Sequence, residues 1–223
     1  MKLAIITDTH FGARNDNLNF NEYFYKFYDN VFFPTLKERG ITTCVHMGDV
    51  TDRRKYISYR IANDFRERFV NRFKEMNIDL HIMIGNHDTY YKNTSEVNSM
   101  QELVGSDNFK IYTGPEVVEF DGTPILFIPW INSNNYEASM DALNTANADI
   151  AMGHLEVNGF EMHKGQRAEG KQDKKLFRRF ETVFSGHFHH KSDDGQIFYL
   201  GTPYEIFWND YDDPKGFHIF DTD

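Results

Sequence analysis

The chain has 223 residues, a formal net charge of −10 and a hydrophobic content of 40%. This length suffices for a packed core, and no apolar stretch reaches the roughly 20 residues needed to cross a bilayer. The acidic charge disfavours a protein that simply coats nucleic acid, although a carboxylate-rich site for divalent cations is negative by construction.

Two further features bear on location. Cys44 is the single cysteine, which excludes an internal disulfide and suits a reducing compartment. The apolar run at the start of the chain is too short for a signal peptide. We therefore expect a cytoplasmic protein without a membrane span.

The first half of the chain alternates strand and helix patterns. Nearly continuous apolar runs predict buried strands, and apolar positions spaced by three or four residues predict helices, the first of them kinked or ended by Pro34. In chain order we expect strand 2–7, helix 20–36, strand 42–47, helix 57–73 and strand 80–84. This order predicts parallel βαβ units.

The second half of the chain has a different pattern of apolar runs and turns. Asp121-Gly122 between two apolar runs predicts a hairpin over 117–128. Around it we expect helices at 95–104 and 136–146 and strands at 149–153, 182–185, 197–200 and 216–220. The sequence has no repeat or linker, so we expect one α/β domain over residues 1–223.

Polar side chains follow five of the predicted strands. Each cluster alone has an ordinary interpretation, since Asp8-Thr9-His10 is compatible with a helix cap and Asp49 to Asp52 with an Asx turn. A lone histidine after a strand is also more often a turn residue than a ligand. Together, however, the strand ends supply seven candidate metal ligands: Asp8, His10, Asp49, Asn86, His154, His187 and His189.

These donors indicate the kind of metal site. Carboxylate, imidazole and amide groups without cysteine favour borderline-hard divalent ions such as Mn²⁺, Mg²⁺, Fe²⁺ or Zn²⁺. Seven ligands are too many for one ion that must also bind substrate. Two ions sharing a carboxylate are the usual solution for phosphoester hydrolysis.

The same residues form motifs that resemble the calcineurin-like metallophosphoesterases. The motifs are Asp8-x-His10, Gly48-Asp49-x-x-Asp52, Gly85-Asn86-His87-Asp88, Gly153-His154 and Gly186-His187-x-His189. The resemblance implies a two-sheet β sandwich flanked by helices, a four-layer αββα arrangement with the metals at one edge.

The resemblance also implies a role for each residue. Asp8, His10 and His189 would hold one ion, Asn86, His154 and His187 the other, and Asp49 would bridge them. His87 would act as the catalytic acid toward the leaving oxygen, oriented by Asp52. Gly85 is interpreted as a sharp turn, and Asp88 as a carboxylate that supports the ligands or caps a helix.

Within this superfamily the chain is similar to SbcD-type DNA repair nucleases, including the nuclease subunit of T-even-like phage recombination complexes. The likeness rests on Arg53-Arg54 after the Asp49 motif, on Ile128-Pro129-Trp130, and on Gly201-Thr202-Pro203-Tyr204 followed by Asp213-Pro214-Lys215-Gly216-Phe217. It implies a Mn²⁺-dependent exonuclease and endonuclease that acts on double-stranded ends and single strands. The alternatives are a phosphomonoesterase, a cyclic-nucleotide phosphodiesterase and a metal-free scaffold on this fold.

The likeness implies partners as well. It predicts a homodimer bound to an SbcC-like coiled-coil ATPase, in the host cytoplasm if a phage encodes the chain. Relatives continue past the closing strand into DNA-capping and ATPase-docking regions, which we expect to be absent because the sequence stops at Asp223.

Several basic and aromatic side chains are candidate DNA contacts. They are Arg53, Arg54, Lys55, Tyr90 and Lys92 near the site, with Lys164 and Arg167 opening a basic run that reaches Arg179. A solvated surface explains the basic run equally well, and core packing explains Tyr90. The tyrosines of the two long helices, Tyr23, Tyr25, Tyr28, Tyr56 and Tyr59, suggest a subunit interface.

Overall fold

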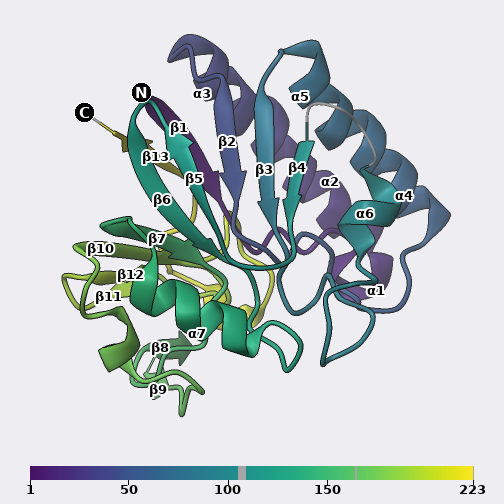
Figure 1. Ribbon diagram of the computed structural model, residues 1–223. Helices are drawn as coiled ribbons and strands as arrows, with labels where there is room; N and C mark the ends of the chain where they lie inside the picture. The colour runs from purple at the N-terminus through teal and green to yellow at the C-terminus, as the bar shows by residue number, and fades with distance from the viewer. Residues whose placement is uncertain (105–108, 164, 223) are drawn as a thin grey trace.

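A five-stranded sheet combines four strands from the first half of the chain with the last strand in the computed structural model, which describes residues 1–104, 109–163 and 165–222 (Figure 1). Its order is β13-β1-β2-β3-β4. The strands are β1 (Lys2–Ile6), β2 (Thr43–His46), β3 (Asp79–Met83), β4 (Phe109–Tyr112) and β13 (His218–Asp221). The first four are parallel, as predicted for β1, β2 and β3, and β13 pairs antiparallel with β1.

A second, six-stranded sheet is mixed, with the order β11-β12-β10-β7-β6-β5. Its strands are β5 (Glu116–Phe120), β6 (Thr123–Ile128), β7 (Ile150–Gly153), β10 (Thr182–Ser185), β11 (Ser192–Asp193) and β12 (Ile197–Tyr199). Asp121 and Gly122 both have positive φ in the β5–β6 turn, so the predicted hairpin is confirmed. A small separate hairpin joins β8 (Glu161–His163) and β9 (Gln166–Arg167).

Two long helices correspond to the predicted ones. The first comprises α2 (Leu18–Phe27), a π-helical turn (Tyr28–Phe32) and α3 (Phe33–Glu38); the second comprises α4 (Tyr59–Phe65), a π-helical turn (Arg66–Val70) and α5 (Asn71–Glu75). The shorter elements are α1 (Ala13–Asp16), α6 (Ser99–Leu103), α7 (Tyr136–Thr145) and 3₁₀ turns at Lys174–Phe177 and Trp208–Asp210. None of the helices in the described part of the chain is long and apolar enough to cross a bilayer.

Pro34 does not end its helix. The helix widens before the proline, where the Phe33 amide donates to the carbonyl of Tyr28 five residues back, and it then continues to Glu38. Since proline lacks an amide hydrogen, the π-helical turn adjusts the ladder locally without breaking it.

The layers follow from the alternation of side chains along the strands. Leu3 and Ile5 of β1 face Phe127 and Met152 of the second sheet, whereas Ala4 and Ile6 face the aromatic side of the two long helices. The outer face of the second sheet packs under Leu143 of α7 and Phe177. Two sheets flanked by helices are therefore confirmed, in the predicted αββα order.

Candidate metal centre

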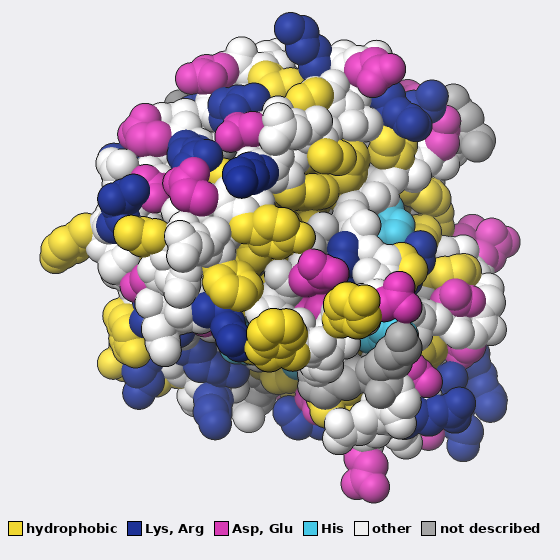
Figure 2. Space-filling view, turned by 180° about the vertical axis from the view of Figure 1, so that it is seen from behind, with side chains coloured by type: hydrophobic (Ala, Val, Ile, Leu, Met, Phe, Trp, Pro, Cys, Tyr) yellow, Lys and Arg dark blue, Asp and Glu magenta, His cyan; other side chains and the backbone are white. Residues whose placement is uncertain are grey.

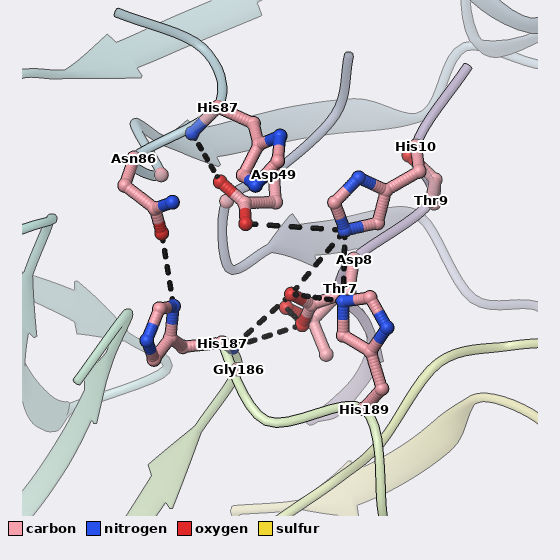
Figure 3. A network of polar contacts seen from close by, with 12 residues as sticks. Thr7, Asp8, Thr9, His10, Asp49, Asn86, His87, Gly186, His187 and His189 are labelled. Atoms are coloured by element: carbon pink, nitrogen blue, oxygen red, sulfur yellow. Dashed lines mark hydrogen bonds and ion pairs between the residues drawn. The ribbon is translucent and has the colours of Figure 1, made fainter. Parts of the chain in front are cut away.

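The polar loops that follow five parallel strands meet at one edge of the sandwich. β1 leads to Asp8 and His10, β2 to Asp49, β3 to Asn86, β7 to His154, and β10 to His187 and His189. The first three strands belong to one sheet and the last two to the other. The seven predicted ligands thus lie together: Figure 3 labels six of them, and the seventh, His154, lies against Asn86.

One group of donors consists of Asp8, His10 and His189. The Nε2 atoms of the two histidines lie 3.0 Å apart, and each is 3.9 Å from Asp8 Oδ1. Asp8 is fully buried and accepts hydrogen bonds from Thr7 Oγ1 at 2.6 Å and from the His187 amide. Two imidazole nitrogens aimed at one point beside a carboxylate are an arrangement that suits a divalent cation.

A second group surrounds the amide oxygen of Asn86. This Oδ1 lies 3.1 Å from Nε2 of His154 and 2.9 Å from Nδ1 of His187. His154 donates from Nδ1 to the carbonyl of Met47 at 2.8 Å, so Nε2 carries the lone pair in the neutral ring. Nε2 faces two oxygens, Asn86 Oδ1 and Asp49 Oδ2, so these three atoms can share either a proton or a cation.

Asp49 lies between the two groups. Its Oδ2 is 3.2 Å from His154 Nε2 and 3.9 Å from His10 Nε2, while Oδ1 accepts from the His87 amide at 2.7 Å. One carboxylate therefore reaches toward both groups (Figure 3).

The electrostatics of these donor groups suit cation binding. Burial lowers the pKa of His187 to about 3 and holds that of His189 well below its ordinary value, so both rings present free lone pairs at neutral pH. Burial also raises the pKa of Asp8 to about 6. For His154 the charge of Asp49 outweighs the effect of burial and raises the pKa to about 9. A cation that replaces this proton would satisfy the same carboxylate.

Several of the predicted ligands adopt the left-handed backbone conformation, which residues other than glycine rarely adopt. Asp8, His10, Asp49 and His187 have φ values of 53°, 44°, 53° and 82°. Such conformations cost on the order of 1 kcal/mol each and persist where the surroundings enforce them. Their concentration at these loops is typical of a functional site.

His87 is held differently from the sequence prediction. Its Nδ1 lies 2.5 Å from the backbone carbonyl of Asp52, whereas the Asp52 carboxylate lies 3.4 Å from Nδ1 of His10. The carbonyl can only accept, so Nδ1 carries a proton in both charge states of His87. The prediction that the Asp52 carboxylate orients His87 is therefore wrong: the main chain of Asp52 does so, and its side chain supports His10.

Asp88 gains a definite structural role. The carboxylate is fully buried and accepts from the Gly85 amide at 2.9 Å and from the Thr51 amide at 3.0 Å. Thr51 Oγ1 also bonds to Ser99 at the start of α6. Asp88 thus ties the loop carrying Asn86 to the loop carrying Asp49, which the sequence pattern did not reveal.

The closing segment, residues 201–217, supports the site from behind. Tyr204 donates through its hydroxyl to the carbonyl of Thr9 at 2.6 Å, between two ligands. Lys215 donates to the carbonyl of His189 at 2.9 Å and pairs with Asp213 at 2.7 Å. The motifs of this segment therefore fix the backbone of three predicted ligands.

The candidate DNA contacts lie in separate places. Arg53, Arg54, Lys55 and Tyr90 line a hollow of ≈ 170 Å³, with Arg53 paired to Asp16 and Arg54 donating to Thr89. Lys92 lines another hollow of ≈ 560 Å³ with Trp130, whose ring lies 5.2 Å from that of His187. Arg167 is exposed on β9, and Lys164 lies outside the described residues.

The interface predicted from tyrosines needs correction. Tyr25 and Tyr28 are fully buried, because their rings pack around Phe11 in the core under the helices. Tyr23, Tyr56 and Tyr59 are exposed. Only these three remain available to a partner.

Comparisons with known proteins agree with this geometry. The family model for calcineurin-like phosphoesterases matches residues 1–191. "Exonuclease subunit 1" of Enterobacteria phage T4 is 37% identical over 188 residues, covering 84% of this chain and 55% of that protein. The chain thus spans about half the length of this curated relative.

Solved structures with similar folds are more distant in sequence. GAP50, the anchor in the inner membrane complex of Plasmodium, has a TM-score of 0.57 at 13% identity, covering 98% of this chain and 80% of that one. A novel archaeal phosphodiesterase has a TM-score of 0.45 at 14% identity, covering 100% and 94%. The first similarity supports the fold alone.

Proposed function

The chain belongs to the calcineurin-like phosphoesterase family, and we propose that it is a two-metal DNA phosphodiesterase, an exonuclease and endonuclease for DNA ends in recombination and repair. The observation that carries the proposal is the convergence of six donor residues around a seventh, Asp49, with His87 beside them. The 37% identity to a phage protein named as an exonuclease subunit favours DNA over small phosphoesters.

The roles of the residues follow from their positions. Asp8, His10 and His189 would hold one divalent ion, Asn86, His154 and His187 the other, and Asp49 both. Two divalent ions held by these residues would supply Lewis-acid chemistry toward a phosphoryl oxygen and an activated water as the nucleophile. We propose Mn²⁺ as the physiological metal.

His87 would act as the general acid. With Nδ1 held by the Asp52 carbonyl, Nε2 is the nitrogen that exchanges a proton, and it would protonate the leaving oxygen. His10 lies edge-on to His87 with ring centroids 4.9 Å apart, which places the acid next to the ligands.

The proposal extends to assembly. Residues 1–223 would form one nuclease domain acting with an SbcC-like coiled-coil ATPase, in the cytoplasm of the host of a phage. A homodimer would use the exposed Tyr23, Tyr56 and Tyr59. Arg53, Arg54, Lys55, Tyr90, Lys92, Lys164 and Arg167 are the proposed DNA contacts.

Two substitutions test the site together. His87→Ala removes the acid but no ligand, so we expect hydrolysis to fall about 10²–10⁴-fold while both metals stay bound. Asp49→Ala removes the bridging carboxylate, so both metal content and hydrolysis should fall. The measurements are elemental analysis after dialysis and Mn²⁺-dependent release of nucleotides from linear duplex and single-stranded DNA.

The outcomes separate the possibilities. An empty site in His87→Ala would contradict the assignment of acid and ligands. Turnover of p-nitrophenyl phosphate or cyclic nucleotides far above that of DNA would replace the nuclease proposal with a small-molecule phosphoesterase. A wild-type chain that takes up no metal would indicate a scaffold.

A further inference from the structure

An apolar groove runs between the start of α2 and the closing segment. Its volume is ≈ 420 Å³, and its walls are mainly aromatic: Phe20, Tyr23, Phe207, Trp208 and Tyr211. Trp208 and Tyr211 are 89% and 77% exposed. Hydrophobic side chains gather across the middle of the face seen in Figure 2, and parts of histidine side chains show among them.

The groove continues into the metal centre. A second hollow of ≈ 360 Å³ is lined by His187, His189 and Phe207, so Phe207 forms a wall of both. The Phe207 ring lies nearly parallel to the His189 imidazole, at an interplanar angle of 16° with centroids 5.9 Å apart. A substrate whose phosphate sits among the ligands can therefore extend directly along the aromatic wall.

One basic side chain, Arg14, lies beside the aromatic wall of this groove. The Arg14 guanidinium lies 5.6 Å from the Phe20 ring and 5.8 Å from the Phe207 ring. It is carried by α1, where Arg14, Asn15 and Asp16 all have left-handed φ near 58°, a turn that costs about 1–2 kcal/mol per residue. Arg53 pairs with Asp16 and holds this turn in place.

The chemistry of the groove points to one occupant. Aromatic faces beside a cation bind unpaired nucleobases and their phosphates, because every base has a face to stack and every phosphate a charge. A duplex hides its base faces, so only an unpaired strand fits. Glu205, the one acidic side chain on the wall, accepts from the Tyr23 hydroxyl at 3.4 Å.

We propose that this aromatic groove binds the unpaired bases of a single-stranded DNA end whose phosphate lies at the metal centre. The inference rests on the proposed nuclease function and names the form of DNA that the site receives. It assigns base stacking to Trp208 and Tyr211 and phosphate contact to Arg14.

Trp208→Ala and Tyr211→Ala test the proposal, because both side chains are exposed and their removal leaves the core intact. The probe is an eight-nucleotide single-stranded DNA, used as an inhibitor of bis(p-nitrophenyl) phosphate hydrolysis and as a labelled ligand in fluorescence anisotropy. Each variant should raise the inhibition constant and the dissociation constant about tenfold. Hydrolysis of bis(p-nitrophenyl) phosphate should stay unchanged.

Two controls sharpen the result. Val117→Ala removes an apolar side chain that is 43% exposed on β5, outside the groove, and should bind the oligonucleotide like the wild type. An oligonucleotide of the same length made of abasic sites should bind weakly to the wild type and equally to the Trp208 variant.

The outcomes separate the groove proposal from the proposed nuclease function on which it rests. Unchanged oligonucleotide binding in a Trp208→Ala, Tyr211→Ala double variant would overturn the groove proposal and leave a protein partner as its occupant. Absence of bis(p-nitrophenyl) phosphate and DNA hydrolysis by the metal-loaded wild type would refute the proposed function, while anisotropy would still report on the groove.

Discussion

Gly85 has no room for a side chain, because a Cβ atom there would overlap both the amide nitrogen and Oδ1 of Asp49. Gly85 does begin a turn, since its carbonyl accepts from the Asp88 amide at 3.3 Å, but its φ is not positive, so the turn does not need the left-handed conformation that glycine allows. What the position requires is close approach of two loops. Gly186 is likewise so close to Thr7 and Asp8 that a Cβ atom would overlap their side chains.

Gly85→Ala should therefore push Asp49 out of its proposed bridging position and reduce metal binding, at a cost in stability of about 1–3 kcal/mol. Gly114→Ala is the matched control, since a Cβ there meets nothing within 4 Å and its φ is not positive. Metal titration by isothermal calorimetry and denaturant unfolding of both variants check the expectation. Equal metal affinity in the two would show that the loops can separate without harm.

At the scale of elements, the closing segment binds the two halves of the metal centre together. Tyr204 reaches the loop after β1, and Lys215 reaches the loop after β10. Lys215 is also the cation for Asp213 and lies 3.5 Å from Asp210, and both carboxylates are buried. The segment is thus an internal brace for the ligands as well as the wall of the aromatic groove.

Lys215→Met should lower the free energy of unfolding by about 3 kcal/mol, because it removes the ammonium group from two buried carboxylates, leaving Asp213 with His190 and Asp210 with two backbone amides. Metal affinity should fall as well, since the His189 carbonyl loses its donor. Lys174→Met is the control: it breaks a pair with Asp194 at the surface, which is worth at most about 1 kcal/mol. If Lys215→Met loses no more unfolding free energy than Lys174→Met, Lys215 is not needed to hold the closing segment against the ligand loops.

The elements that were predicted are those with strong local patterns. Apolar runs ending in Gly, Asp or His identified five strand ends, and the site follows from them because parallel strands end at one edge. β4 and the β8–β9 hairpin have no counterpart among the predicted elements, since their short mixed sequences lack a clear period. The contact of the Asp52 carboxylate with His10 depends on how two loops pack, which no local pattern encodes.

At the scale of the whole molecule, the two sheets bury a polar group between them. His81 of β3 lies at 5% exposure among Phe120, Phe127 and Tyr112, and its Nδ1 bonds to the Tyr112 hydroxyl at 2.7 Å. Burial, with a smaller effect from Lys110, lowers the pKa of His81 to about 4 from 6.5. The sandwich is therefore built around a neutral imidazole.

His81 should make the fold sensitive to acid. Between pH 6.5 and 4 the unfolded chain binds a proton that the folded chain does not, so the free energy of unfolding falls as pH drops through this window. The contribution is fully present above pH 6.5, and its loss should approach about 2–3 kcal/mol near pH 4. His81→Gln keeps a polar partner for Tyr112 but cannot titrate, so its stability should decline less steeply. Urea unfolding of both proteins at several pH values measures the difference, and parallel curves would mean that His81 accepts a proton without disturbing the sandwich.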